Sequence, residues 1–400
     1  MKIGFLQQDF ATACLYFTIT ISCSSGLSST LQESKAKPRS GILQGLLNVA
    51  LESPLWKSVL VPQARANIVN TAEANGIRWN DCRNWIKKQV DPTEMLHNDE
   101  MDEENHIYPS YYKRPFHAYE NGNLCWDAAF EQEIAGRAVG ARNFPAYGEK
   151  GEDAFRSAFD DALHSLGAKC PDGGKILDFG CGTGTSTRRL AARWLEASKI
   201  IGLDFSPYYI TIGEKLLELA PRSVLENGDW VTTIREDDRI NLRVGDATNT
   251  GLPDNCVSVV NVGLVVHELP VEAACSLCDE ALRLLKPGGQ LWLYEMDFDS
   301  PGFSKQRSNP LLFSLIRSTE PWLDVYADGC DAIREHIYSK FETVRIAAAT
   351  GRHYALVATK GSLNSNTASI VEDMRFKPDG TYSKDDTHLK TWESNKDTIS

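Results

Sequence analysis

The sequence predicts an α/β protein with a doubly wound, seven-stranded sheet, an antiparallel last strand and a helical extension ahead of it. Between residues 175 and 297, short apolar runs alternate with amphipathic segments. Near-continuous apolar strands that alternate with helices are typical of a parallel sheet covered on both faces. Two further apolar runs, 341–350 and 352–359, follow each other almost directly. Such close spacing predicts a hairpin, and hence an antiparallel strand joined to the parallel sheet.

Each element of this architecture has its own pattern. Strands are expected at residues 175–179, 199–204, 240–246, 257–266 and 288–297, followed by the hairpin. Helices are expected between them, at 185–196, 207–220 and 270–285. Upstream, residues 41–90 carry a helical apolar period that Pro54 and Pro62 divide into short helices, and 128–142 is again helical.

The chain divides into five parts by composition. Residues 1–25 are predicted to be a signal or targeting segment, 26–40 a linker or transit-like segment, and 41–147 a helical extension that includes a substrate lid. Residues 148–360 form the α/β domain. Residues 361–400 are rich in Ser, Thr, Asn, Asp and Lys, which predicts a poorly ordered polar tail.

The first part has the features of a signal peptide. Lys2 precedes an almost uncharged segment from Phe10 to Cys23, and small residues follow up to Gly26. The apolar run of about 14 residues is shorter than the roughly 20 that a membrane-spanning helix needs. We therefore expect cleavage near Cys23 to Gly26 and, with the transit-like linker, import into a plastid. The alternatives are the secretory pathway, an uncleaved membrane anchor and a buried first helix; no stable membrane span is expected in the mature chain.

Charge and cysteine content limit the partners and cofactors. The chain carries 42 basic and 54 acidic side chains, for a formal net charge of -12, and no long basic run offsets it. A nucleic-acid partner is therefore not expected, because phosphate binding needs a clustered positive surface. Ten cysteines fall at irregular spacings, and the one CxxC, Cys275 and Cys278, lies in an amphipathic helix where core packing is the commoner role. We predict no metal site and no disulfide framework.

The turn after the first strand, DFGCGTGTS, indicates a ligand site. Gly180, Gly182 and Gly184 lack side chains, so the backbone can approach a ligand at the start of a helix. In a doubly wound sheet, ligands bind at the carboxyl ends of the strands, where the strand order reverses. The dinucleotide pattern GxGxxG is absent because Thr185 occupies the place of its third glycine, and the lysine of a phosphate loop is missing. Asp178 would repel a pyrophosphate but attract an ammonium group.

Two more acids end the next two strands. Asp204 follows Gly184 by 20 residues, the offset at which a carboxylate accepts hydrogen bonds from both ribose hydroxyls. Asp246 ends the third strand, where it can accept from an adenine amine while the backbone of Ala247 contacts a ring nitrogen. An ammonium, a ribose and an adenine without any phosphate describe S-adenosylmethionine.

Four motifs, in order, resemble those of class I S-adenosylmethionine-dependent methyltransferases. They are LDFGCGTG, IIGLDFS, GDA and ALRLLKPGGQLWLYE, within residues 148–360. VVHELP with the downstream LKPGG resembles the small-molecule branch, of methyltransferase types 11 and 25, that includes quinone biosynthesis. The upstream YPSYYKRPFHAYENGNLCW is similar to a segment in plant and algal plastid members of this type. The resemblance implies a Rossmann-like sheet and S-adenosylmethionine as the methyl donor.

The resemblance also implies a role for each motif residue. Asp178, Gly180, Gly182 and Gly184 surround the methionine portion, and Asn261 faces it through its backbone; Asp204 holds the ribose, Phe205 packs on the adenine face, and Asp246 and Ala247 bound the adenine edge. Taken singly, each glycine is equally consistent with an ordinary helix-start turn. Three strand-end acids in register are harder to explain in that way.

Methyl transfer from a sulfonium needs mainly a nucleophile held in line with the methyl group. A general base matters only if the acceptor carries a proton, and His267, after the fourth strand, is the candidate because the ordinary pKa of histidine is about 6.5. The alternative is a histidine that caps the next helix or bonds a backbone carbonyl. Glu295, Tyr112 and His117 are candidate contacts to the acceptor. The aromatic segment, residues 107–126, is the predicted substrate lid. The other interpretation is that its rings pack the extension against the sheet.

The predicted function is transfer of a methyl group to a small-molecule acceptor by in-line displacement. Two alternatives stay open: a methyltransferase-like protein that only binds the cofactor or a partner, and a methyltransferase of protein or RNA. RNA is disfavoured by the acidic charge, and the Asn/Asp-Pro-Pro-aromatic sequence common in amide and adenine N-methylation is replaced by VGLVVHELP. The acceptor and the oligomeric state are left open.

Overall fold

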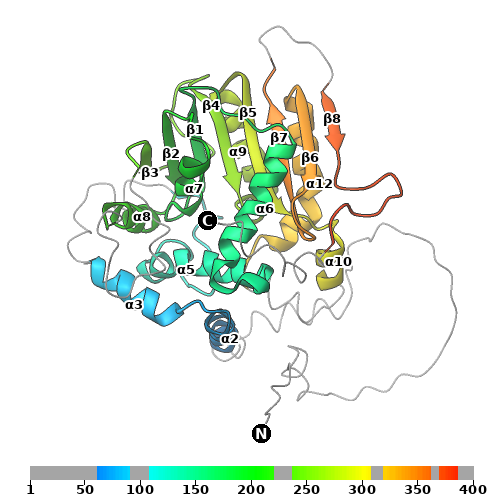
Figure 1. The fold of residues 1–400 in the computed structure, drawn as a ribbon. Helices are drawn as coiled ribbons and strands as arrows, with labels where there is room; N and C mark the ends of the chain where they lie inside the picture. The colour runs from blue at the N-terminus through cyan, green and yellow to red at the C-terminus, as the bar shows by residue number, and fades with distance from the viewer. Residues whose placement is uncertain (1–60, 91–107, 220–236, 308–318, 362–368, 386–400) are drawn as a thin grey trace, which may run out of the picture. The chain divides into compact units, whose positions relative to one another are not determined.

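A computed structural model describes residues 61–90, 108–219, 237–307, 319–361 and 369–385. Its centre is one eight-stranded mixed sheet with the order β3-β2-β1-β4-β5-β7-β6-β8 (Figure 1). The first five strands are parallel, and β7 runs antiparallel to both β5 and β6. The predicted fold class is confirmed, with one strand more than expected. The predicted targeting segment, the linker and the acidic stretch 91–105 lie outside the described residues.

The strands are short and mostly apolar, as their patterns predict. They are β1 (Lys175–Phe179), β2 (Lys199–Asp204), β3 (Ile240–Val244), β4 (Val257–Gly263), β5 (Leu285–Met296), β6 (Thr343–Ala348), β7 (His353–Thr359) and β8 (Ile370–Asp373). The order reverses at β1, which pairs with β2 on one side and β4 on the other. The carboxyl ends of these strands are therefore where a sheet of this kind binds its ligands.

Helices cover both faces of the sheet (Figure 1). On one face lie α6 (Gly151–Ser165) and α7 (Thr185–Arg193), and on the other α9 (Val271–Leu284) and α12 (Leu323–Lys340). Side chains alternate along each strand, so Leu177 and Phe179 face α9 and α12 while Ile176 faces α6 and α7. Burial of both faces explains why the strands are apolar almost throughout.

The helical extension packs through a separate apolar cluster. α2 (Val61–Ala74), α3 (Trp79–Gln89) and α5 (Trp126–Asn143) meet α8 (Pro207–Leu219), the helix that follows β2. The largest buried members of this cluster include Trp79, Ile86, Phe130 and Ile134. The short helical turn η3 (Pro145–Lys150) then leads from α5 into α6. The extension is thereby attached to the half of the sheet that contains the glycine turn.

The prediction of a poorly ordered tail is wrong for residues 369–385. β8 pairs in parallel with β6 at the edge of the sheet. Arg375 is 5% exposed and Tyr382 is 8% exposed, so both side chains are buried in the domain. Composition failed here because the buried contacts are polar, and a polar segment without an apolar period carries no sign of packing.

Both cysteines of the CxxC lie on α9: Cys278 is buried in the core, and Cys275 is half-buried and packs against that core. The remaining short helices of the described chain are η6 (Val266–Glu268), directly after β4, and α10 (Pro301–Arg307), after β5. Among the helices that the structure describes, none has the length and apolar character of a membrane span.

Candidate active site

The glycine turn joins β1 to α7 at the middle of the sheet. Gly180, Gly182 and Gly184 have φ values of 65°, 56° and 87°, in the left-handed region that other residues rarely adopt. Space is also short, because a Cβ on Gly180 would lie 2.5 Å from Cγ2 of Val265. The backbone conformation therefore requires glycine here, and the turn presents main-chain atoms at the carboxyl end of β1.

Asp204 ends β2 beside this turn. Its Oδ2 accepts a hydrogen bond from the Gly182 amide and its Oδ1 accepts one from the Ser206 amide, both at 2.8 Å. Burial raises the pKa of Asp204 to about 6, although the Ser206 and Gly182 amides oppose the rise. A carboxylate has roughly four acceptor positions, so two remain for donors such as the hydroxyls of a ribose. The ribose role of Asp204 stays a prediction that this geometry permits.

Asp178 is held inside the junction of β1 and α7. Its side chain is 1% exposed and accepts hydrogen bonds from Ser186, Thr187 and Asn261, at 2.7, 2.6 and 2.8 Å. These donors come from the first turn of α7 and from β4, so Asp178 ties the helix to the sheet. The sequence argument aimed this carboxylate at an ammonium group, whereas the structure directs it to neighbouring side chains. The Asn261 side chain points to Asp178, which leaves its backbone for the predicted contact.

Phe205 and Asp246 lie at the predicted adenine end. Phe205 is half-buried, and its ring centroid lies 5.1 Å from that of Tyr108 and 5.0 Å from that of Tyr112. Oδ1 of Asp246 accepts hydrogen bonds from the amide and the hydroxyl of Thr248, both at 2.7 Å, and so stabilises the turn after β3. Ala247 packs against the core on the α9 side. These residues lie just beyond the ends of β2 and β3, and two tyrosines of the aromatic segment pack on Phe205.

The helical extension is bonded to the glycine turn through Glu133. Glu133 on α5 is 2% exposed and pairs with Arg188 on α7, with 2.7 Å between Oε2 and Nη2. Thr183 and Thr185, both in the turn, donate to the same carboxylate oxygen at 3.0 and 2.7 Å. Burial alone would raise the pKa of Glu133, but Arg188 and Arg137 lower it to about 2. The pair is therefore charged at neutral pH and fixes the turn to the extension.

His267 lies in η6, at the carboxyl end of β4, and is 5% exposed. Its Nδ1 lies 2.8 Å from Oε1 of Glu295, and its amide donates to Oε2 at 3.2 Å. Glu295, near the end of β5, is fully buried and also accepts from the Met296 amide at 2.7 Å. Burial would lower the pKa of His267, but Glu295 raises it to about 10. This shift favours the imidazolium at neutral pH, and the proton-accepting role of His267 stays a prediction.

Glu295 therefore binds and orients His267. Its two oxygen atoms are taken by the ring, the His267 amide and the Met296 amide, and its side chain is 0% exposed. An acceptor would meet His267 first, so the direct acceptor contact predicted for Glu295 does not match its position.

Two more carboxyl groups interact electrostatically with His267. Glu268 Oε1 is 4.0 Å from Nε2, and burial raises the pKa of Glu268 to about 8 against the attraction of His267. Burial also raises the pKa of Glu320, a rise that His267 and Arg142 oppose. Oε2 of Glu320 is buried and has no hydrogen-bond partner in the described part of the chain. Since an unmatched buried oxygen is costly, this corner indicates a place that a polar group of a ligand can fill.

The aromatic segment covers both halves of the site. Tyr112 is half-buried, and desolvation raises its pKa well above the ordinary value; the charges of Asp204 and Glu268 add to the rise. The His117 amide donates to the Thr319 carbonyl at 2.7 Å, which attaches the segment to the residues ahead of α12. The segment therefore bridges the strand ends and α12, and contact of Tyr112 or His117 with an acceptor stays a prediction.

Sequence reasoning did not select Glu133 or Glu320. Glu133 lies about one helical turn after Phe130 and directly before Ile134, so it is a charged residue next to the apolar face of its helix. That placement is the sequence signal of a buried ion pair. Glu320 has no such signal, because it stands outside any helix or strand pattern and joins the site only through the fold.

The fold and the site together define a class of protein. A glycine turn, a buried acid at the neighbouring strand end and an aromatic side chain meet at the point where strand order reverses, as in nucleoside-binding α/β enzymes. The residues present fit S-adenosylmethionine, with the turn at the methionine portion, Asp204 at the ribose and Phe205 at the adenine. That group, when bound, supplies a methyl group on a sulfonium.

Sequence comparison with known families and relatives supports this class. Residues 177–293 match the model of the methyltransferase domain family. The chain is similar to a demethylmenaquinone methyltransferase of Lactiplantibacillus plantarum, 34% identical over 29% of this chain and 42% of that protein. It is similar to a sterol 24-C-methyltransferase of Yarrowia lipolytica, 34% identical over 36% of this chain and 34% of that protein. A solved arsenic(III) S-adenosylmethionine methyltransferase from Chlamydomonas reinhardtii matches 54% of this chain and 75% of its own, with 18% identity and a TM-score of 0.34.

Residues 177–293 thus resemble a methyltransferase domain, and S-adenosylmethionine is the methyl donor of that class. The chain spans 42% and 34% of the lengths of the two curated relatives. The family match does not include the aromatic segment, so the resemblance of that segment to plastid proteins stays a prediction.

Proposed function

We propose that the protein transfers a methyl group from S-adenosylmethionine to a small-molecule acceptor by in-line displacement. The observation that carries this proposal is the presence of two sets of residues at adjacent strand ends. Asp204 and the glycine turn form the nucleoside side, and His267 with Glu268 forms the acceptor side. Tyr112 lies near both Asp204 and Glu268, so the two sides belong to one site.

The residues of this chain act by position and charge. Asp204 and the turn would hold the nucleoside, and Glu295 fixes the His267 ring through Nδ1. That contact leaves the Nε2–H of His267 to donate to an oxygen atom of the acceptor. Correct placement of two reactants can supply roughly 7–11 kcal/mol of the barrier reduction. The aromatic segment excludes water from the reacting atoms.

An acceptor that carries a proton must lose it when the methyl group is added. Glu268 lies 4.0 Å from Nε2 of His267, and its pKa is about 8. A group with a pKa near the working pH is suited to general base catalysis. We therefore assign proton acceptance to Glu268 and hydrogen-bond donation to His267, in place of the base role first considered for His267.

Two observations favour a small acceptor. The relatives named above are methyltransferases of demethylmenaquinone and of a sterol. In addition, the aromatic segment is attached at Phe205 on one side and at Thr319 on the other, which encloses the acceptor side. An enclosed site suits a small molecule better than the surface of a folded protein.

The test has two stages. Isothermal titration of the full chain with S-adenosylhomocysteine is expected to show one site; the absence of binding would contradict the proposal. Whole extracts of cells that lack the protein, which contain both small molecules and proteins, are then incubated with the protein and methyl-labelled S-adenosylmethionine. Label in a small molecule is the expected result. Label in protein would favour a protein methyltransferase, and binding without any labelled product would favour a binding protein.

A further inference from the structure

The C-terminal segment, residues 369–385, reaches the carboxyl end of β5. β8 pairs with β6 in the register Thr343 to Ile370 through Ile346 to Asp373, and the pairing is parallel. Beyond β8 the chain folds back on itself, since the Ser383 amide donates to the Arg375 carbonyl at 2.7 Å. This small hairpin contains Arg375 and Tyr382.

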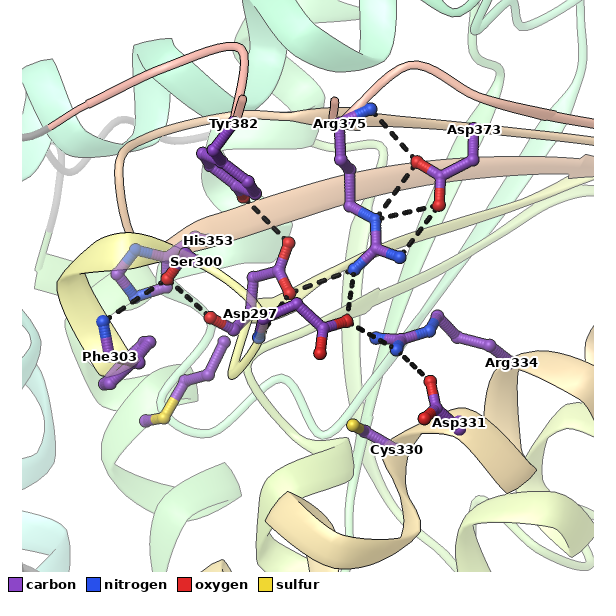
Figure 2. A network of polar contacts seen from close by, with 12 residues as sticks. Asp297, Ser300, Phe303, Cys330, Asp331, Arg334, His353, Asp373, Arg375 and Tyr382 are labelled. Carbon is purple, nitrogen blue, oxygen red and sulfur yellow. Dashed lines mark hydrogen bonds and ion pairs between the residues drawn. The ribbon is translucent and has the colours of Figure 1, made fainter. Parts of the chain in front are cut away.

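Arg375 and Tyr382 converge on Asp297 (Figure 2). Tyr382 donates its hydroxyl to Oδ2 of Asp297 at 2.7 Å, and Nη1 of Arg375 donates to Oδ1 at 3.0 Å. Asp297 is 0% exposed, and burial raises its pKa while Arg375 and Tyr382 oppose the rise. The C-terminal segment therefore supplies both the countercharge and the hydroxyl donor of a fully buried carboxylate.

Arg375 is itself held by other carboxylates. Nη2 of Arg375 lies 2.8 Å from Oδ2 of Asp373, and Nη1 lies 3.1 Å from Oδ2 of Asp299. Asp299 also accepts from Arg334 on α12 at 2.9 Å. Because Arg375 has several fixed partners, its position is determined by more than the contact with Asp297.

Asp297 lies two residues after Glu295, and side chains two residues apart point to the same side of an extended chain. The backbone between them is fixed as well, since the Met296 carbonyl accepts from the Tyr326 hydroxyl at 2.8 Å. Tyr354 is paired with Glu295 in the β5–β7 register, and the guanidinium of Arg375 lies 5.9 Å from its ring. Two routes thus join the C-terminal segment to Glu295.

We propose that residues 369–385 are a supporting part of the active site, in which Arg375 and Tyr382 are positioning residues that hold Asp297 and thereby keep Glu295 against His267. The inference depends on the proposed function, because that function assigns His267 to the acceptor side. Neither Arg375 nor Tyr382 touches the acceptor in this account. Their effect passes through the end of β5.

The experiment follows the imidazole of His267 by NMR in the full chain with ¹⁵N-labelled histidine. His267 is recognised as the signal that is lost in His267→Gln. The titratable groups that interact with its ring are Glu295 on β5, Glu268 on its own turn, Glu320 ahead of α12, Tyr326 on α12, and the histidines His117 and His353. In the wild type the titration midpoint is expected at about 10.

Arg375→Gln and Tyr382→Phe should each lower this midpoint by about one pH unit, because a looser carboxylate stabilises the imidazolium less. The dissociation constant of S-adenosylhomocysteine should stay within about twofold, a change of only about 0.4 kcal/mol. If Arg375→Gln does not fold, Tyr382→Phe decides, since it removes one hydroxyl and keeps the ring. Folded variants with an unchanged midpoint would overturn the proposal.

Arg345→Gln is the matched control. It breaks the exposed pair of Arg345 and Glu372, 2.9 Å apart, which also joins β6 to β8 but lies away from Asp297. The titration midpoint of His267 in this variant should equal that of the wild type. A fall as large as that in Arg375→Gln would overturn the proposal, because any loosening of β8 would then produce the effect. The midpoint is measured without ligand. Failure of the wild type to bind S-adenosylhomocysteine would therefore count against the proposed function and leave this result separate.

Discussion

Glu133 on α5 and Arg188 on α7 form a buried ion pair beneath the glycine turn, with 2.7 Å between Oε2 and Nη2. Arg188 also donates to the Thr183 carbonyl at 2.8 Å, so the pair reaches the backbone of the turn itself. The N-terminal extension is therefore part of the ligand site's structure and does more than pack against the sheet.

Replacing Glu133 with Gln leaves the Arg188 guanidinium buried without its countercharge. We expect the free energy of unfolding to fall by about 3–5 kcal/mol, as for other broken buried pairs. Urea denaturation at pH 7 measures this loss. Arg345→Gln, which removes an exposed pair, is the control and should cost less than about 1 kcal/mol. Equal losses in the two variants would contradict the structural role given to Glu133.

The same pair predicts how stability depends on pH. The pKa of Glu133 is lowered from 4.5 to about 2, so its stabilising contribution is fully present above pH 4.5 and is lost as pH falls toward 2. The difference in unfolding free energy between the wild type and Glu133→Gln should therefore shrink as pH falls below 4.5. Denaturation series at several pH values check this, and a constant difference would contradict it.

Asp204→Ala should weaken the binding of S-adenosylhomocysteine at least tenfold, because the ribose hydroxyls would lose a buried acceptor, a loss of at least about 1.4 kcal/mol. Isothermal titration gives the two dissociation constants. Asp279→Ala, which removes a partly exposed acid paired with His336, is the control and should bind as the wild type does. Unchanged affinity in Asp204→Ala would mean that the predicted register of the site is wrong.

The raised pKa of Asp204 predicts a pH dependence of that binding. Below pH 6 the free carboxyl group is increasingly protonated and offers fewer acceptor positions. The dissociation constant of S-adenosylhomocysteine should therefore rise as pH falls through about 6, by up to about tenfold per pH unit. In Asp204→Asn the constant should be flat over the same range. A flat profile in the wild type would contradict the assignment.

His267→Gln and Glu295→Gln should both slow transfer of the labelled methyl group, by roughly 10²-fold, the scale of losing one positioned proton-transfer or donor group. Both should retain the wild-type affinity for S-adenosylhomocysteine, because neither residue lies on the nucleoside side. Incorporation of label and isothermal titration measure the two quantities. Loss of cofactor binding in either variant would place the His267–Glu295 pair on the wrong side of the site.

The fold class could be predicted because the alternation of apolar strands and helices is a local pattern. The same pattern predicts Asp204 and His267 at strand ends, and hence near one another. It could not predict the charge state of His267, since the neighbour that raises its pKa, Glu295, lies on a different strand.

Polar contacts between distant segments were also beyond the sequence. Asp178 has the motif position of a ligand-facing acid, yet its donors on α7 and β4 direct it inward. Arg375 stands in a segment whose composition is that of a disordered tail, and only its contact with Asp297 shows that the segment is folded. Such pairs leave no periodic signal, because each partner is a single residue in its own stretch of chain.

A structure of the full chain bound to S-adenosylhomocysteine tests the central claim most directly. We expect both ribose hydroxyls to bond to the Asp204 carboxylate, the adenine to lie on Phe205, and the sulfur to face His267 and Glu268. A nucleoside bound away from the β2 end, or an Asp204 carboxylate without contact to the ribose, would contradict it.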